Sequence, residues 1–448
     1  MTDFDVILIG AGPAGEHCAG RLAEGGLRVA IVERELVAGE CSYWACIPSK
    51  TLLRPGEALA AAREAPGARE AVTGEIDVQQ AFAWRDFQVS DYDDSGQVAW
   101  LEDEGIELIR GDGRIEGPGK VAVGDRTYTT THIVISTGSE PAIPPVPGLR
   151  GLDGIWTNRE ATGIKEVPKR VIVLGAGPVG VEMGQALTRL GSSVAIVEGA
   201  DRVLSREPAA LGDALGQVLA AEGIELKLGR LASGVSREGD EYVVEFEDAP
   251  ALRADNLLVA TGRRPRVENI GLETVAIEPG RQGIEVDERM SAADGVWAIG
   301  DVTGIWPLTY VGKYQGRIAA SNILGHPRQA NYDAVPRVVF TDPQAAAVGE
   351  ADGPLTATVK LSEVARTSTY TRAYDQKPSF LTLVSDGELL TGAYALGPDA
   401  GEWLQQATVA IRGRIPLEVF KDTIQPFPTF AEAFLHGLLE LEAKAPAT

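Results

Sequence analysis

The chain has 448 residues, of which 44% are hydrophobic and 23% are charged, and its formal net charge is -23. That length is too great for one compact core and favours about three domains. Such a negative surface repels phosphate backbones, so we do not expect a nucleic-acid partner. No run of about 18 apolar residues exists and the N-terminus lacks a basic lead, so we expect neither a membrane span nor a signal peptide. Three cysteines are too few for a secreted disulfide framework, which favours a cytoplasmic protein.

The first predicted unit is a strand, a glycine-rich turn, a helix and a second strand. The apolar run 4–9 is typical of a buried parallel strand. The turn GAGPAG follows at 10–15, and a helical stretch continues to about Glu24. The run 28–33 predicts a second strand, which ends in Glu33.

The same pattern returns at 170–198, which indicates an internal duplication. A strand precedes the turn GAGPVG at 175–180, and the next strand ends in Glu198, 18 residues after the third glycine as in the first copy. A second echo supports the duplication, because an apolar strand precedes both TGSEP at Thr137 and TGRRP at Thr261.

Each glycine turn predicts a dinucleotide site, since each follows a strand, opens a helix and is followed by an acid. The first glycine permits the tight turn, the second lets the backbone approach a pyrophosphate, and the third lets helix and strand pack closely. The helix N-terminus offers free N–H groups to the phosphates. Glu33 and Glu198 are predicted to bind ribose hydroxyls. The alternative is two glycine turns without a ligand.

Two sites imply two different nucleotides. A carboxylate at Glu198 would repel a 2′-phosphate, so NADH is favoured over NADPH at the second site. Arg202 and Arg206 lie nearby and could soften that preference.

Cys41 and Cys46 form a closely spaced pair in the segment GECSYWACIPSK. Residues five apart in a regular helix have Cα atoms roughly 8.7 Å apart, whereas a disulfide needs less than about 7 Å. The pair can therefore bond only across a distorted turn, with Pro48 near the start of the next helix. A bond in such a short ring suits a reversible redox couple. The alternatives are a zinc site or two inert buried cysteines, and Cys18 is expected to be simple core.

The rest of the chain carries no further nucleotide turn. The proline-rich stretch 141–148 predicts a linker between the two units. From about 336 the pattern changes to strands and helices, with a β-hairpin over 380–396 around Asp386-Gly387 and a helix over 400–412.

Two dinucleotide turns together with Cys-x-x-x-x-Cys-Ile-Pro-Ser-Lys at 41–50 resemble the pyridine nucleotide–disulfide oxidoreductases. That family includes dihydrolipoyl dehydrogenase, glutathione reductase and mercuric reductase. The resemblance covers nearly the whole chain, because GVWAIGDV at 295–302 is similar to the second FAD motif and FTDPQAAAVG at 340–349 is similar to the start of the dimerisation domain.

The resemblance implies an α/β fold with two dinucleotide-binding (Rossmann-like) domains, a C-terminal α+β dimerisation domain and a homodimer. The implied limits are 1–150 for the FAD-binding domain, 151–265 for the NAD(P)-binding domain, 266–335 for a returning segment that completes the FAD-binding domain, and 336–448 for the dimerisation domain.

The resemblance also implies an electron path from NAD(P)H through FAD to the cysteine pair. Cys41 is then the interchange thiol that meets the substrate, and Cys46 is the charge-transfer thiol against the flavin. Lys50 and Glu182 look like the ion pair near flavin N5, and a buried lysine does need a carboxylate partner. The alternative for Lys50 is a plain surface lysine.

The residues implied to bind cofactors follow the two turns and the later motifs. For FAD they are Gly10, Gly12, Pro13, Ala14, Gly15, Glu33, Lys50, Gly113, Thr137, Gly138, Gly300 and Asp301, where Asp301 would bind the ribityl chain. For NAD they are Gly175, Gly177, Pro178, Val179, Gly180, Glu198 and Gly262. No metal ligand is predicted.

One position departs from the family pattern. Its disulfide-reducing members carry a His-Pro near the C-terminus, and this histidine acts from the other subunit as the acid/base for the interchange thiol, oriented by a Glu five residues later. Here Glu432 is present, but Phe427 stands at the histidine position. Phenylalanine cannot move protons, and losing a general base typically costs about 10²–10⁴ in rate. His436, Tyr43 and Tyr310 are the substitutes we consider.

Mercuric reductases also lack this histidine and show a similar Phe-Pro stretch. They carry a Cys-Cys pair at the extreme C-terminus, whereas this chain has no cysteine after Cys46. The loop 42–45 is also bulky, so Tyr43 and Trp44 are expected either to shape a flat substrate pocket or to pack in the core.

Three hypotheses for the electron acceptor follow. The first is a reductase of a low-molecular-weight or small-protein disulfide with an unusual proton path. The second is an NAD(P)H reductase of quinones, metal ions or other non-disulfide acceptors. The third is a redox sensor or complex subunit that turns over little.

Overall fold

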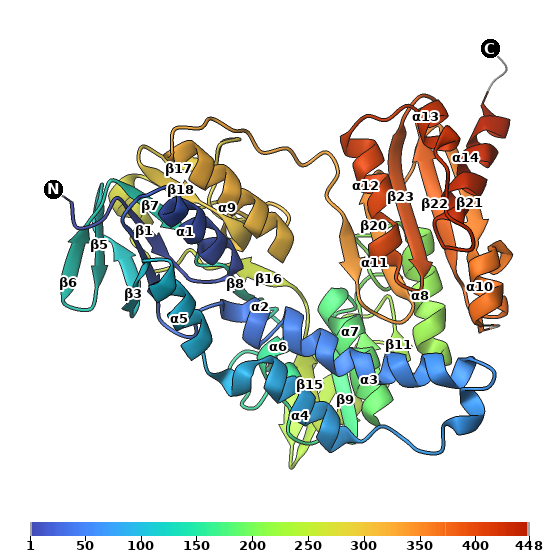
Figure 1. The fold of residues 1–448 in the computed structure, drawn as a ribbon. Coiled ribbons are helices and arrows are strands. Elements are labelled where there is room, and N and C mark those ends of the chain that lie inside the picture. Colours follow the sequence, from blue (N-terminus) through green and yellow to red (C-terminus); the bar gives the residue numbers. More distant parts are fainter. Residues whose placement is uncertain (1, 372, 446–448) are drawn as a thin grey trace. The chain divides into compact units, whose positions relative to one another are not determined.

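The computed structural model describes residues 2–371 and 373–445, and the chain divides into two compact units (Figure 1). The first unit comprises the chain up to Pro48 with Trp84–Ala142 and Gly262–Asn331. The second comprises Ser49–Ala83, Ile143–Thr261 and the chain from Tyr332. Within the described residues, no helix is both long and apolar enough to cross a membrane.

The first unit is built on a six-stranded sheet with the order β17-β18-β7-β1-β2-β3. Five of its strands run parallel, and only β17 pairs antiparallel with β18. The sheet strands are β1 (Val6–Ile9), β2 (Val29–Glu33), β3 (Glu107–Arg110), β7 (His132–Ile135), β17 (Ser291–Ala293) and β18 (Val296–Ala298).

Successive residues of β1 point to opposite faces of this sheet, and each face has its own core. Val6 and Leu8 pack with the helices α1 (Pro13–Glu24) and α9 (Thr309–Ile323), which lie side by side in Figure 1. Ile7 and Ile9 pack instead with a three-stranded antiparallel sheet made of β4 (Gly113–Ile115), β5 (Lys120–Val123) and β6 (Arg126–Thr129).

A short antiparallel pair, β8 (Ser139–Pro141) with β16 (Arg263–Pro265), joins the point where the chain leaves the first unit to the point where it returns. The Ala142 N–H donates to the Gly262 carbonyl at 2.9 Å beside it. The remaining elements of this unit are α2 (Gly39–Tyr43), α5 (Ser95–Asp103) and the 3₁₀ helices η2 (Ser90–Tyr92), η3 (Leu272–Val275) and η4 (Gly300–Thr303).

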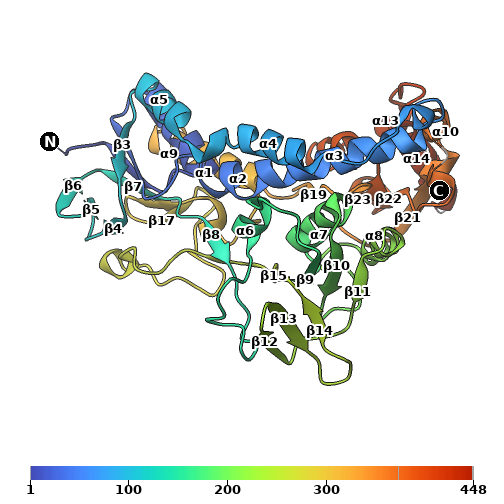
Figure 2. The ribbon, with the colours of Figure 1, turned by 90° about the horizontal axis from the view of Figure 1, so that it is seen from below.

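The second unit repeats this plan in a parallel four-stranded sheet with the order β11-β10-β9-β15. Its strands are β9 (Arg170–Leu174), β10 (Ser193–Val197), β11 (Glu225–Lys227) and β15 (Asn256–Val259). Val171 and Val173 pack with α7 (Pro178–Leu190) and α8 (Ala209–Ala221). Ile172 and Leu174 pack with a three-stranded sheet of β12 (Gly234–Glu238), β13 (Glu241–Glu245) and β14 (Leu252–Ala254), seen beside β15 in Figure 2.

The C-terminal part of this unit is a five-stranded antiparallel sheet with helices packed on it. The sheet order is β19-β20-β23-β22-β21, with bounds Arg337–Val339, Gln344–Gly349, Leu390–Gly397, Phe380–Ser385 and Leu355–Lys360. The helices are α10 (Ala365–Tyr370), α11 (Ala400–Trp403), α12 (Gln405–Arg412), α13 (Leu417–Asp422) and α14 (Glu432–Lys444), with η5 (Leu361–Glu363) and η6 (Ala373–Asp375).

The other helices are α3 (Cys46–Glu64), η1 (Arg69–Ala71), α4 (Val78–Gln88) and α6 (Asn158–Thr162). The predicted hairpin over 380–396 is confirmed as β22 and β23, with Asp386 and Gly387 in the turn. The predicted helix over 400–412 is interrupted at Leu404, where Ala407 donates to the Leu404 carbonyl in a tighter i→i+3 bond.

Candidate active site

In both turns the first and the third glycine occupy positions where a side chain would be strained or would clash. Gly10 and Gly175 have φ of 105° and 103°, a left-handed conformation that favours glycine. A Cβ on Gly15 would lie 2.2 Å from the Gly10 carbonyl oxygen, and a Cβ on Gly180 would lie 1.9 Å from that of Gly175.

The middle glycines differ from these, because a Cβ on Gly12 or Gly177 would meet nothing within 4 Å. The space over each turn is therefore open where a helix begins, with Pro13 and Pro178 in the first positions of α1 and α7. Open backbone at a helix N-terminus fits a pyrophosphate group. The residues of both turns thus fit the FAD and the pyridine nucleotide that the sequence predicts there.

The acids at the strand ends hold these turns together. Glu33 accepts the N–H groups of Ala11 and Glu35, both at 2.8 Å. Glu198 accepts those of Ala176 at 2.8 Å and Ala200 at 2.9 Å. The sequence predicted ribose contacts for these carboxylates and missed their backbone partners. A ribose role for either carboxylate stays a prediction.

Among the other residues predicted to bind FAD, Asp301, Gly300 and Gly138 have polar or open surroundings, whereas Gly113 does not. Asp301 lies in η4 and accepts the Ser139 hydroxyl at 2.6 Å, while the Gly300 N–H donates to the side chain of Gln315 at 2.6 Å. Gly138 has a φ of 72° and open space around it. By contrast, a Cβ on Gly113 would lie 3.0 Å from the Ile9 side chain, so this glycine is closely packed.

Further predicted residues have simpler surroundings. The Thr137 hydroxyl donates to the Arg266 carbonyl at 2.7 Å. Ala14 and Val179 lie in the first turns of α1 and α7. Gly262 has a φ of 125°, and a Cβ there would meet nothing within 4 Å. Arg202 pairs with its neighbour Asp201 at 3.0 Å.

A half-buried carboxyl lies directly after the first turn. Burial raises the pKa of Glu16 to about 7; Lys313 on the neighbouring helix lowers it, and Glu33 raises it further. No motif drew attention to this residue, because a glutamate in the first turn of a helix is ordinary.

The chain breaks its helix between the two cysteines, as their spacing predicts. Cys41 lies in α2, which ends at Tyr43, and Cys46 begins α3, with Pro48 in the first turn. Both cysteines are half-buried and in the thiol form. The Thr309 hydroxyl, at the start of α9, is 3.4 Å from the Cys41 sulfur and 3.3 Å from the Cys46 sulfur. One hydroxyl therefore lies within hydrogen-bonding distance of both sulfurs.

Cys41 and Cys18 both have a raised pKa, for different reasons. The hydrogen bond with Cys46, followed by burial, raises the pKa of Cys41, while Thr309 and Lys313 act in the opposite direction. Cys18 is fully buried in the core as predicted, and burial raises its pKa to about 12. Within the described part of the chain, no three His, Cys, Asp or Glu side chains are grouped to hold a metal ion.

The predicted partners Lys50 and Glu182 form an ion pair with Nζ and Oε2 2.7 Å apart. Glu182 is buried on α7, and its other oxygen accepts the Phe340 N–H at 2.9 Å. The Lys50 ammonium lies 4.6 Å from the centre of the Phe340 ring. The catalytic role of the pair stays a prediction.

The C-terminal candidates lie around the start of α14. Phe427 is 72% exposed. Glu432 is half-buried and its Oε2 has no hydrogen-bond partner, whereas its Oε1 is 3.9 Å from Nε2 of His436, one turn along the helix. Residues 446–448, which include the end of the chain that lacks the Cys-Cys pair, lie outside the described residues.

Of the two interpretations of Tyr43, the structure favours core packing. This side chain is 1% exposed, packs with Ala38 and Val89, and donates its hydroxyl to Gln97 at 3.2 Å. Burial raises the pKa of Tyr43 to about 12, which makes it a poor base near neutral pH. Tyr310 is 43% exposed.

Sequence reasoning missed Thr309, Ser139 and Phe340, which contact the cysteines, Asp301 and Lys50 respectively. A threonine, a serine and a phenylalanine outside any motif carry no signal of such contacts in a single sequence.

Comparison with known proteins gives two family matches and close relatives. The model described as pyridine nucleotide-disulphide oxidoreductase matches residues 4–316, and that of its dimerisation domain matches residues 335–437. A dihydrolipoyl dehydrogenase of Thermus scotoductus is 34% identical over 99% of this chain and 99% of its own length. A mercuric reductase of Staphylococcus aureus is 31% identical over 96% of this chain and 81% of its own length.

Two solved structures share the fold. The HOCl-induced flavoprotein disulfide reductase RclA from Escherichia coli, in a Cu(II) complex, has a TM-score of 0.85 and 25% identity and covers 99% of this chain and 100% of its own. LpdA from Mycobacterium tuberculosis has a TM-score of 0.86 and 26% identity and covers 98% of this chain and 99% of its own. The predicted family and fold class are confirmed: this chain is a flavoenzyme that belongs to the pyridine nucleotide-disulphide oxidoreductase family.

Proposed function

We propose that the protein uses NAD(P)H to reduce the Cys41–Cys46 disulfide, and that the resulting dithiol reduces a disulfide substrate. FAD, when bound, supplies the two-electron relay between the nicotinamide and the cysteine pair. In this proposal Gly10, Gly12, Gly15, Glu33 and Asp301 hold FAD. Gly175, Gly177, Gly180 and Glu198 hold the pyridine nucleotide.

The observation that carries the proposal is the Thr309 hydroxyl, which lies within hydrogen-bonding distance of both sulfurs. The two thiols also hydrogen-bond to each other, so they are close enough to act as a redox pair. Both belong to the unit that contains the first glycine turn.

The thiol chemistry balances without any further reactant. Cys41 loses its proton, and the thiolate attacks one sulfur of the substrate disulfide, forms a mixed disulfide and releases the first substrate thiolate, which takes up that proton. Cys46 then loses its proton and attacks the Cys41 sulfur, which re-forms the Cys41–Cys46 bond and releases the second thiolate, which takes up the second proton. The substrate has gained two electrons and two protons, and the dithiol has lost them.

Proton transfer is the weak point of this cycle. The pKa of Cys41 is raised, so little thiolate exists near neutral pH. Phe427 cannot act as a base, and the unpaired Oε2 of Glu432 fits a carboxylate whose histidine partner has been replaced. We therefore expect the rate of disulfide reduction to rise with pH through the neutral range.

Phe427 in place of the family's histidine also supports a second function. Reduction of a quinone or metal ion does not need a histidine that protonates a leaving thiolate. Relatives named mercuric reductases and a neighbouring structure named as a Cu(II) complex favour this alternative. A low-turnover redox sensor or complex subunit is the third possibility.

Assembly and nucleotide choice complete the proposal. A dimerisation domain over 335–437 supports a homodimer, in which Phe427 would reach Cys41 of the partner subunit. Glu198 supports NADH over NADPH. From the family resemblance we also propose the domain limits 1–150, 151–265, 266–335 and 336–448.

The decisive experiment is an anaerobic titration of the FAD-loaded protein with NADH or dithionite. A long-wavelength thiolate-to-flavin absorption band supports Cys46 as the charge-transfer thiol. Steady-state assays of wild type and Cys41→Ser on disulfides, quinones and metal ions then separate the functions. Loss of disulfide reduction alone supports the first function, whereas unchanged reduction of quinones or metal ions with no wild-type disulfide turnover supports the second. A wild type that binds FAD but turns over no acceptor supports the third.

Phe427→His tests the proton path. The new imidazole would lie near the unpaired Oε2 of Glu432, and we expect disulfide turnover at pH 7 to rise by at least tenfold. The double variant Phe427→His, Glu432→Gln is the control and should lose part of that gain. No gain in the single variant would contradict the disulfide substrate or the position given to Phe427.

A further inference from the structure

The segment Phe340–Asp342, which directly follows β19, is held along one face of α7. The carboxylate of Glu182 accepts the Phe340 N–H at 2.9 Å. Gln185 accepts the Asp342 N–H and donates to the Asp342 carbonyl, both at 2.8 Å. Arg189 binds the Asp342 carboxylate at 2.8 Å. We call Glu182, Gln185 and Arg189 the α7 clamp, since their spacing of three and four residues places them on one helix face.

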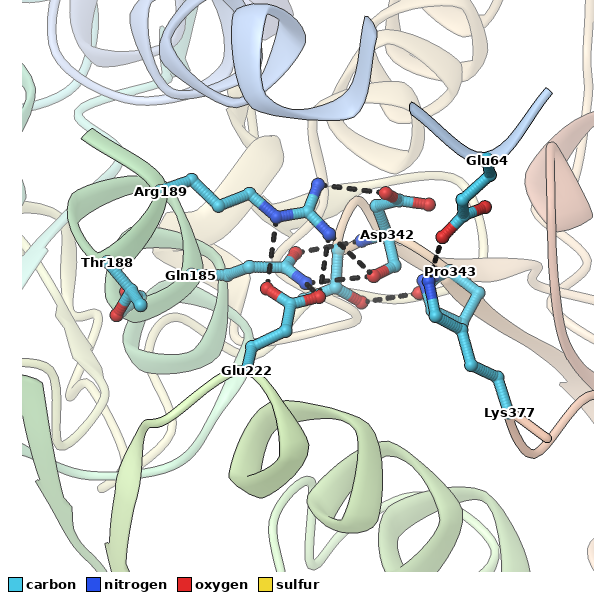
Figure 3. Close-up of polar contacts among 10 residues, drawn as sticks. Glu64, Gln185, Thr188, Arg189, Glu222, Asp342, Pro343 and Lys377 are labelled. Carbon is cyan, nitrogen blue, oxygen red and sulfur yellow. Dashed lines mark hydrogen bonds and ion pairs between the residues drawn. The ribbon is translucent and has the colours of Figure 1, made fainter. Parts of the chain in front are cut away.

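The far end of the clamp is itself fixed. Figure 3 shows the Arg189 guanidinium between Asp342 and Glu222. Its Nε and Nη2 donate to the two Glu222 oxygens at 3.0 and 2.6 Å. A guanidinium bound on two sides and only 13% exposed has little freedom to move. The segment it binds is therefore held in one position relative to α7.

Phe340, at the near end of the clamp, contacts both members of the Lys50–Glu182 pair. Its N–H binds Glu182, and its ring lies 4.6 Å from the Lys50 ammonium. The Lys50 side chain is 36% exposed and has a flexible four-carbon stem, so the ion pair alone leaves it free to swing. An aromatic face attracts a cation and restricts that motion.

We propose that Phe340 is a positioning residue for the Lys50–Glu182 pair, and that the α7 clamp holds Phe340 in place. This inference rests on the proposed function, because it takes Lys50 to be the cation at the flavin. A cation held in one position stabilises the negative charge of a reduced flavin better than a mobile one does.

The test compares FAD-loaded Phe340→Leu with Phe340→Tyr. Leucine keeps an apolar side chain and the backbone N–H but removes the aromatic face. We expect a more negative flavin midpoint potential and a flavin reduction by NADH that is about two- to fivefold slower in anaerobic stopped flow. Tyrosine keeps the ring and should restore both values.

Phe380→Leu is the matched control. Phe380 lies in the same unit and packs against Tyr394. Its loss should lower the thermal midpoint without changing the flavin potential. The inference is overturned if Phe340→Leu has the wild-type potential and reduction rate, or if Phe380→Leu shifts both equally. The comparison of potentials needs only bound FAD, so an absent thiolate-to-flavin band would reject the proposed cysteine roles and leave this comparison valid.

The clamp is tested separately by Arg189→Met, with Arg170→Met as its control. Arg170 also binds two carboxylates, Glu241 and Asp255, neither of which forms an ion pair with the clamp residues or with the segment Phe340–Asp342. We expect Arg189→Met to shift the flavin potential in the same direction as Phe340→Leu, by a smaller amount, and Arg170→Met to leave it unchanged. Equal potentials in both arginine variants would reject the role of the clamp.

Discussion

The two glycine turns have nearly the same backbone, but the two residues that follow the third glycine differ between them. Gly15 is followed by Glu16 and His17, whereas Gly180 is followed by Val181 and Glu182. Val181 is fully buried in an apolar core, while Glu16 is half-buried and its carboxyl has a raised pKa. Glu182 forms an ion pair with Lys50, while His17 is exposed. The backbone needed for phosphate binding is thus common to both copies, and the residues directly after it distinguish their chemistry.

If both turns have the same structure, replacing the third glycine of either turn should have the largest effect on the free energy of unfolding. A Cβ on Gly15 or Gly180 would meet a backbone carbonyl, which cannot move aside as a side chain can. We expect Gly15→Ala and Gly180→Ala each to lower the free energy of unfolding by about 3 kcal/mol or more. Urea denaturation followed by circular dichroism measures both. A large loss in only one variant would break the equivalence of the turns.

Replacing Glu16 should have the next largest effect on the free energy of unfolding. We expect this effect to depend on pH, and we expect no such pH dependence from the second turn. The Glu16 pKa of about 7 lies above the ordinary value of 4.5, so between these pH values the folded chain binds more protons than the unfolded chain. Stability is therefore lost as pH rises through this window. Glu16→Gln should raise the free energy of unfolding by about 2 kcal/mol at pH 8 and by little at pH 4.5.

Val181→Ala is the counterpart in the second turn. Removing its buried methyl groups should cost about 2 kcal/mol at pH 8 and at pH 4.5 alike. A gain for Glu16→Gln that is equal at both pH values would contradict the raised pKa.

The strand-end acids should show a smaller and equal effect. A carboxamide offers one accepting oxygen to the two N–H groups that Glu33 or Glu198 now binds. We expect Glu33→Gln and Glu198→Gln each to cost about 1 kcal/mol. Only Glu198→Gln should also raise activity with NADPH relative to NADH. A change of coenzyme preference in Glu33→Gln would be inconsistent with the two assignments.

The middle glycine should have the smallest effect on stability. Alanine at Gly12 or Gly177 meets no atom within 4 Å, and both residues have negative φ. The free energy of unfolding should change by less than about 0.5 kcal/mol. The FAD content of purified protein should fall in Gly12→Ala alone, and the KM for NADH should rise in Gly177→Ala alone. Loss of both cofactors in one variant would mean that the turns are not independent.

The periodic parts of the fold could be predicted from sequence because their physics is local. A strand, three glycines, a helix and an acid at a fixed distance are all determined by neighbours in the chain, and so is the hairpin at Asp386-Gly387. The break at Leu404 could not be predicted, since it depends on one tighter hydrogen bond within an otherwise helical stretch.

The candidate site divides in the same way. The cysteine pair and the broken helix between its members could be predicted from spacing and the geometry of a disulfide. The contacts of Thr309 with Cys46 and Cys41, which lie 263 and 268 positions earlier in the chain, could not be predicted. The contact of Phe340 with Lys50 could not be predicted either. Such contacts arise from tertiary packing, and a single sequence carries no record of them.

The short pair β8–β16 bears on how such a chain can change over time. Everything between Ala142 and Gly262 leaves and re-enters at one hydrogen-bonded point, with Arg263 bound to the Ser139 side chain and carbonyl at 2.7 and 2.8 Å. The sheet and both cores of the first unit include no residue between Ala142 and Gly262. A different segment joined at the same two strands would therefore leave the sheet order and both cores of the first unit unchanged.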